Sequence, residues 1–175
     1  MVINTVLGLI LTVLFYLVVP VVILFTIRDK KVLFIIATVL ISLFMIALFV
    51  MTLFDVSISK EVVTIYADFS GQWCSKNIHF SLLYGGIRDV VINLAMVIPM
   101  GGYIVIYNAC FDKKHTLLKC LLIGLIIGFS IEALQFILPV SRSIQLRDML
   151  LNALSTVIGG IIYIVIYKIR NKIIK

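Results

Sequence analysis

The chain has 175 residues, of which 63% are hydrophobic and only 13% are charged, and its mean hydropathy is +1.24. Apolar runs of about twenty residues recur along it, so its hydrophobic side chains cannot all be buried in one soluble core, which excludes a soluble globular domain. The formal net charge of +7 suits the anionic lipids of an inner leaflet and needs no nucleic acid partner. We therefore predict an integral membrane protein whose single membrane domain covers residues 1–175.

Five apolar segments are long enough to cross a bilayer. They cover approximately residues 3–27, 32–54, 88–107, 117–138 and 149–167. Each is predicted to be a helix, because a helix is the open segment that satisfies all its backbone hydrogen bonds within hydrocarbon. The first segment lacks the basic start and the small-residue cleavage pattern of a signal peptide, so we expect it to remain as a helix. The predicted fold is a compact, all-α bundle of five transmembrane helices.

The distribution of lysine and arginine predicts the orientation of this bundle. Ten of the 15 basic residues fall between the first two segments, between the third and fourth or at the start of the fourth, or after the fifth, and such residues concentrate on the cytoplasmic side. The N-terminus is then outside, the C-terminus is cytoplasmic, and the connections at about 55–87 and 139–147 are outside. The longer connection mixes apolar residues such as Trp73 with few charges, so we expect a partly interfacial loop containing a short amphipathic helix or a re-entrant segment.

A polar hexad, Arg-Asp-x-x-x-Asn, occurs twice in the chain, each time before an apolar run that ends in Gly-Gly. The two copies comprise Arg88, Asp89 and Asn93, and Arg147, Asp148 and Asn152. Both copies open inward-running helices in the predicted topology, so they lie at the outer ends of two parallel helices, with the asparagines about one turn deeper. A parallel internal repeat would produce this arrangement. The Gly-Gly pairs differ by one residue in their offset from the hexads, so duplication stays open.

The fourth segment carries a third set of polar residues. Gly124, Gly128 and Glu132 recur every four residues along one face, and Gln135 follows three residues later. The glycines predict close helix packing, and the outward direction of this helix brings Glu132 and Gln135 level with the hexads. A carboxylate within a span costs about 3 kcal/mol, so it needs a partner or a wet cavity. We expect the partner of Glu132 to be one of the arginines Arg88, Arg142 and Arg147.

These residues also have interpretations that need no ligand. The Arg-Asp pairs can be interfacial anchors at helix N-termini, where a carboxylate meets the positive end of the helix dipole. The side-chain amides of Asn93, Gln135 and Asn152 can form hydrogen bonds between helices without any ligand. Pro99 predicts a kink in the third segment that widens a cavity on its outer side. The candidate ligand-binding residues are Arg88, Asp89, Asn93, Glu132, Gln135, Arg142, Arg147, Asp148 and Asn152.

Metal and disulfide chemistry are not indicated by the sequence. Cys74 falls in an outer connection, whereas Cys110 and Cys120 fall near the cytoplasmic face, so a structural disulfide is not expected. The spacing of His, Cys, Asp and Glu matches no metal motif, and we expect no cofactor. The oligomeric state is left open.

Several of these motifs together resemble the VanZ-like family of bacterial membrane proteins. The residues that carry the resemblance are 77–80, 93–99, Gly101, Ser130, Glu132, Gln135, Phe136, Asp148, Asn152, Gly159 and Gly160, within a core of about 77–163. The resemblance implies a multi-pass protein of the bacterial plasma membrane with a role in resistance to glycopeptide antibiotics, teicoplanin above all, and related lipoglycopeptides. The chain departs from the family pattern at Gln145 and Arg147, where many members have acidic residues, so the resemblance does not imply a mechanism with several carboxylates there.

The polar residues and the family resemblance together suggest two classes of function. The first is a binding protein, whose outer polar pocket recognises the head group of a membrane lipid, a lipid-linked cell-wall precursor or the lipoglycopeptide antibiotic itself. The alternative is a membrane enzyme or transporter acting on a lipid-linked envelope intermediate, with Glu132 or Asp148 as general acid or base in the enzyme. We favour binding, because the sequence contains no recognisable nucleophile–base pair, phosphate loop or metal cluster.

Overall fold

The computed structural model describes residues 18–53, 55–58, 63–66, 78–79, 87–138 and 144–173. Its long helices are α2 (Lys30–Leu53), α3 (Ile87–Cys110), α4 (Thr116–Ile137) and α5 (Leu146–Ile173), and a further helical segment at 18–26 precedes α2. All four long helices have the length and apolar composition needed to cross a membrane. The prediction of a helical membrane protein is therefore confirmed. Most of the first predicted span, at 3–27, lies outside the described residues, so a fifth transmembrane helix stays a prediction.

Local signals explain where two of these helices begin. The Asp29 side chain accepts hydrogen bonds from the backbone N–H groups of Lys31 at 2.7 Å and Val32 at 3.0 Å, which caps the start of α2. The same bonds, Val32 first, hold the pKa of the Asp29 carboxyl below its ordinary value of 3.8. Before α4 the chain turns sharply, with Asp112 and His115 in the left-handed region at φ 50° and 60°.

The fifth helix is longer than the apolar run that predicted it. The expected span was 149–167, whereas α5 extends from Leu146 to Ile173. The extra turns contain charged residues, Arg147 and Asp148 at the start and Arg170 and Lys172 at the end. Hydropathy does not detect such turns. An acidic residue in the first turn and basic residues in the last turn nevertheless stabilise the helix, because their charges interact favourably with the helix dipole.

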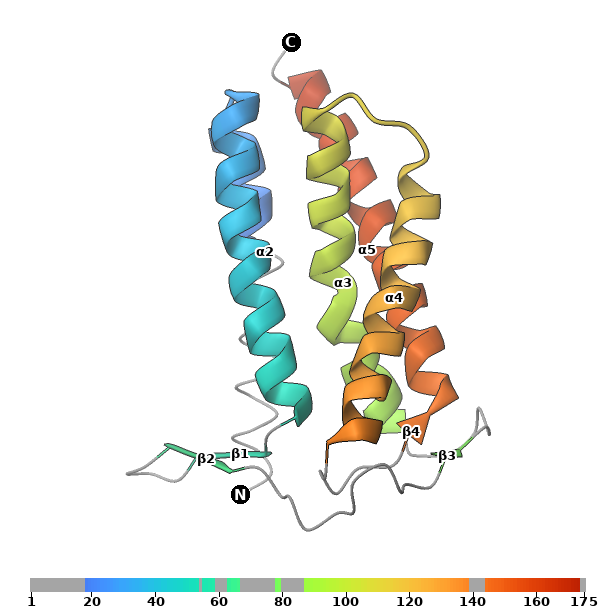
Figure 1. Ribbon diagram of the computed structural model, residues 1–175. Coiled ribbons are helices and arrows are strands. Elements are labelled where there is room, and N and C mark those ends of the chain that lie inside the picture. Colours follow the sequence, from blue (N-terminus) through green and yellow to red (C-terminus); the bar gives the residue numbers. More distant parts are fainter. Residues whose placement is uncertain are drawn as a thin grey trace.

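The four long helices alternate in direction along the chain. Figure 1 shows α3 and α5 running in one direction and α2 and α4 in the other, so the two hexad-bearing helices are parallel. The helix α5 packs against both α3 and α4, and α2 packs mainly against α3. The unit formed by α3, α4 and α5 is therefore the part of the bundle that positions the candidate site.

Glycine makes the contacts within this unit very close. A Cβ on Gly159 would overlap the carbonyl oxygen of Ile98 in α3, and one on Gly128 would lie 2.8 Å from the Cα of Met149 in α5. A Cβ on Gly124 would similarly lie 2.7 Å from the Cα of Ala153. The predicted packing role of Gly124 and Gly128 is confirmed, because only a residue without a side chain allows these backbones to approach so closely.

Large apolar side chains cover the outer faces of the bundle. On α4 the exposed residues recur at steps of three or four and comprise Leu118, Leu122, Ile126 and Phe129, so this stripe faces lipid in a membrane. One buried cluster joins α2, α3 and α4 through Phe44, Val97 and Ile131. A second joins the segment 18–26 to α2 and α3 through Leu24, Ala37 and Ile106.

The described parts of the connection between α2 and α3 are extended strands, β1 (Asp55–Ile58), β2 (Val63–Tyr66) and β3 (Ile78–His79). The expected amphipathic helix or re-entrant segment stays a prediction for the rest of the connection, which lies outside the described residues. β-Branched residues such as Val56, Ile58 and Val63 favour strands over helix, which accounts for the antiparallel pairing of β1 with β2. β3 pairs in parallel with β4 (Ile144–Gln145), immediately before α5.

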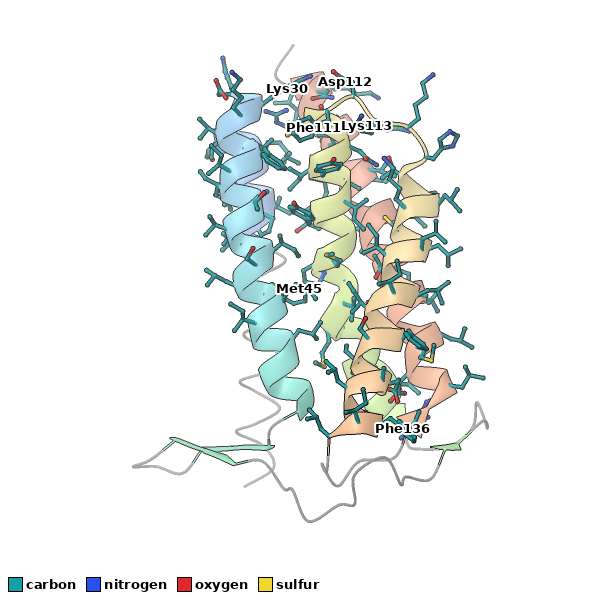
Figure 2. The ribbon with its side chains drawn as sticks, viewed as in Figure 1. Lys30, Met45, Phe111, Asp112, Lys113 and Phe136 are labelled. Carbon is teal, nitrogen blue, oxygen red and sulfur yellow. The ribbon has the colours of Figure 1, made fainter. Side chains whose placement is uncertain are left out.

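Most of the described basic residues lie at one end of the bundle. Figure 2 shows Lys30, Asp112 and Lys113 at one end and Phe136 at the other, and in Figure 1 the strands lie at the same end as the C-terminus of α4. The basic residues in the 27–29 link, at the start of α2, in the α3–α4 link and at the end of α5 share the first end. This is the gathering of positive charge on which the predicted orientation depends.

Candidate functional site

Glu132 ties the end of α4 to the beginning of α5. It lies on the inner face of α4, only 5% exposed, and its Oε2 accepts a hydrogen bond of 2.9 Å from the backbone N–H of Gln145. Gln145 is the last residue of β4. Gln135, one turn beyond Glu132 on the same face, is also buried. The carboxylate thus satisfies a backbone donor that the α4–α5 connection brings to the end of the bundle.

Arg147 extends this chain of contacts into α5. It is also only 5% exposed, and its Nη2 donates to the side-chain Oε1 of Gln145 at 3.1 Å. Its Nε lies 3.4 Å from Oδ1 of Asp148, a longer contact. Glu132, Gln145, Arg147 and Asp148 therefore form one connected group, which we name the polar cluster. The Asp148 side chain, 20% exposed, is its more accessible carboxylate.

The next turn of α5 connects the polar cluster to α3. Asn152 is buried beside Gly128 of α4, and its carbonyl oxygen accepts a 2.8 Å hydrogen bond from Thr156 Oγ1. The hydroxyl of Ser155 donates to the carbonyl oxygen of Leu94 in α3, the residue after the half-buried Asn93. Polar residues from three helices therefore converge at one end of the bundle.

The contacts between α3 and α5 also show that the two hexads lie at nearly the same depth in the bundle. Ser155 meets Leu94, and Gly159 meets Ile98, and both pairs are 61 positions apart in the sequence. The hexads are 59 positions apart. The difference of two residues corresponds to roughly 3 Å along a helix, so the hexads share a depth to within less than one turn.

Most of the predicted site residues lie at this end of the bundle. Asn93, Glu132, Gln135, Arg147, Asp148 and Asn152 are placed there by α3, α4 and α5. Arg88 and Asp89 fall in the first turn of α3, but their side chains lie outside the described part, and Arg142 lies wholly outside it. Their membership of the site stays a prediction.

Gln145 and Ser155 are the residues that the predicted site lacked. The backbone N–H of Gln145 donates to Glu132, and its side-chain oxygen accepts a hydrogen bond from Arg147. The hydroxyl of Ser155 joins α5 to α3. Ser155 could have been found from its place on the polar face of α5, which also holds Asn152 and Gly159. The role of Gln145 depends on the path of a connection, for which the sequence has no periodic signal.

Pro99 lines a cavity that is apolar and separate from the polar cluster. The cavity has a volume of about 20 Å³ and is lined by Pro20, Ala37, Leu40, Ile41, Phe44, Pro99, Tyr103 and Ile106. It therefore lies between the segment 18–26, α2 and α3, and α3 stays helical from Ile87 to Cys110 across the proline. The cavity predicted at Pro99 was to lie on the outer side of a helix kink beside the polar residues, whereas this cavity faces α2 and its lining contains no residue of the polar cluster.

The opposite end of the bundle has polar contacts of another kind. Asn108 is buried and donates to Thr116 Oγ1 at 2.9 Å, while Lys119 Nζ donates to Asn108 Oδ1 at 2.9 Å. Arg170 donates to the carbonyl oxygen of Ile27 at 3.1 Å. The first two bonds join α3 to α4, and the third joins α5 to the link before α2. Over the ranges that the structure describes, no three His, Cys, Asp or Glu residues are grouped as metal ligands, and Cys110 and Cys120 are free thiols.

The fold and the site together define a class of protein. Four helices suited to a membrane, with Arg and Glu side chains buried at one end of the bundle, are the features of a helical membrane protein with an intramembrane polar site. A family model described as VanZ/LLP1 matches residues 13–167, and the chain belongs to this family. Membership supports a VanZ-like membrane protein linked to glycopeptide resistance.

The family match begins in the first apolar segment, so it includes both N-terminal segments as well as the stretch 77–163 that carries the quoted motifs. Comparison with curated proteins and with solved structures found no match.

Proposed function

We propose that this protein binds the polar head group of a membrane lipid, or of a lipid-linked cell-wall precursor, in its polar cluster, and that this binding supports resistance to teicoplanin and related lipoglycopeptides. The observation that carries the proposal is the burial of Arg147 and Glu132, each 5% exposed, within one end of an apolar bundle. Charged groups in such a place are costly and are characteristic of binding sites and transport pathways.

The chemistry of the cluster suits a head group that contains phosphate. The guanidinium of Arg147 is planar and presents several donors, which is the geometry that holds phosphate oxygens. Asp148 is accessible enough to accept a hydrogen bond from a hydroxyl or ammonium group of the same head group. The hydrocarbon chain of the ligand then follows the apolar outer face of the helices, where Leu150 and Leu154 of α5 are exposed.

We place this site at the outer face of the bacterial plasma membrane. The opposite end of the bundle holds the basic links and the basic end of α5, which the positive-inside rule assigns to the cytoplasm. Arg88, Asp89 and Arg142 belong to the same proposal, since the sequence predicts Arg88 and Asp89 at the outer end of the third span and Arg142 in the outer connection at 139–147. A lipoglycopeptide also carries a lipid chain, so the antibiotic is a candidate ligand of the same chemical type.

Resistance measurements test this function. A teicoplanin-susceptible bacterium is given the wild-type gene, Glu132→Gln or Asp148→Asn, and the minimal inhibitory concentration is measured. Both variants remove a negative charge but keep an oxygen that can accept a hydrogen bond, so the bond from Gln145 to residue 132 can still form. We expect both to reduce the inhibitory concentration to that of the host without the gene.

The matched control for this experiment is Ser130→Ala. Ser130 is on the same helix as Glu132, but its hydroxyl donates only to the carbonyl oxygen of Ile126 within α4 among the described contacts. This variant should protect like wild type, and immunoblots of isolated membranes should show equal amounts of all variants. Full protection by both Glu132→Gln and Asp148→Asn at equal membrane levels would contradict the assignment of the site.

A further inference from the structure

Gln145 is held in place by two independent sets of backbone contacts. Its N–H donates to the Glu132 carboxylate at 2.9 Å, and its backbone is in register with His79 in the parallel pairing of β3 with β4. Both contacts use the main chain, so neither depends on the identity of the side chain. The side chain of Gln145 therefore projects from a fixed backbone.

This side chain makes a specific contact with Arg147. Its Oε1 accepts a hydrogen bond of 3.1 Å from Nη2 of the guanidinium. A guanidinium has five N–H donors in a rigid fork, so it can hold the Gln145 oxygen and an anionic oxygen at the same time. An amide oxygen fixes the orientation of the fork and, unlike the Asp148 carboxylate 3.4 Å from its Nε, adds no negative charge beside it. A carboxylate at the same place would fix the orientation and also cancel the charge.

We propose that Gln145 is a positioning residue that orients Arg147 toward the head group, and that its neutral amide makes the site prefer anionic lipids to zwitterionic ones. This inference rests on the proposed function, since it assumes that Arg147 contacts the bound lipid. It goes further by assigning the charge class of the ligand and the residue that sets it.

Two substitutions separate orientation from charge. Gln145→Ala removes the acceptor but keeps the backbone N–H that donates to Glu132. Gln145→Glu keeps an acceptor of nearly the same shape and adds a negative charge. Ser130→Ala is again the matched control, and Arg147→Ala tests whether the guanidinium contacts the lipid at all.

The experiment titrates the purified full chain in detergent with phosphatidylglycerol or with phosphatidylcholine and measures the bound lipid by native mass spectrometry. Wild type and Ser130→Ala should bind phosphatidylglycerol more tightly than phosphatidylcholine. Gln145→Ala should bind phosphatidylglycerol about tenfold more weakly, because a hydrogen bond to a charged group is lost. Gln145→Glu should lose the preference between the two lipids while its melting temperature stays at the wild-type value.

The possible outcomes test the role of Gln145 separately from the proposed lipid binding. If Arg147→Ala abolishes phosphatidylglycerol binding but both Gln145 variants bind both lipids like wild type, the proposed function survives and the role of Gln145 is refuted. If wild type shows no preference for phosphatidylglycerol, the assigned charge class is wrong. If wild type and Arg147→Ala bind both lipids equally, the lipid site itself is refuted. A lower melting temperature in Gln145→Glu with the lipid preference unchanged would indicate a structural role only and would overturn the inference.

Discussion

Glu132 has a structural role as well as a proposed ligand-binding one, and the two can be separated by substitution. Its carboxylate accepts the backbone N–H of Gln145, and both residues are at least partly buried. Glu132→Ala would leave that donor without its acceptor, at a cost of about 1–3 kcal/mol, whereas Glu132→Gln keeps an oxygen in place.

We therefore expect Glu132→Ala to unfold at a clearly lower temperature than Glu132→Gln when both are heated in the same detergent. Circular dichroism at a helix wavelength provides the measurement. Equal midpoints for the two variants would show that the bond to Gln145 does not hold the α4–α5 connection in place.

Helical periodicity explains why several site residues could be predicted from the sequence. Once α4 and α5 are helices of opposite direction, the spacing of Gly124, Gly128 and Glu132 fixes which face meets α5 and at what depth. The contact of Gln145 with Arg147 follows from the course of a connection and from a side-chain rotamer. Neither has a period that a sequence can reveal, so only the three-dimensional structure identified it.

At the scale of the elements, the crossing of α3 and α5 depends on glycine. A Cβ on Gly101 would overlap the backbone oxygen of Thr156 and the backbone nitrogen of Gly160. Relief would require the two helices to separate. A Cβ on the adjacent Gly102 would instead lie 2.6 Å from ring atoms of Tyr163, a side chain that can shift more easily than a backbone.

This difference predicts unequal effects of two neighbouring substitutions. Gly101→Ala should destabilise the protein by about 1–3 kcal/mol or more, as overpacking does, and Gly102→Ala should cost less. Unfolding in mixed micelles with increasing sodium dodecyl sulfate measures both. The close contact of α3 with α5 would be contradicted if Gly102→Ala were the more damaging of the pair.

The long elements were easier to predict than the short ones. Apolar length indicated α2, α3 and α4 with ends within about three residues of those observed, because transfer to hydrocarbon dominates their energetics. The strands β1 to β4 have two to four residues each. Segments so short depend on pairing with distant partners such as Ile78 with Ile144, which the local sequence does not specify.

At the scale of the whole molecule, the parallel helices and the parallel strands support the idea of a repeated unit. α3 and α5 run in the same direction, β3 and β4 pair in parallel before them, and the hexads lie at nearly one depth. α4 packs against α5 in the opposite direction and adds Glu132. One end of the bundle therefore combines polar residues from three helices, while the other end holds most of the described positive charge.

The most direct test of the proposed lipid site is to identify what the protein holds when it is extracted from bacterial membranes. Native mass spectrometry of the gently purified full chain should detect one intact polar lipid on wild type and Ser130→Ala. The lipid should be lost from Glu132→Gln and Asp148→Asn, since an amide accepts hydrogen bonds more weakly than the carboxylates that hold the Gln145 backbone and the Arg147 guanidinium. Equal lipid retention by all four proteins, or conversion of an added lipid-linked phosphate to a product by wild type, would contradict a binding site at this end of the bundle.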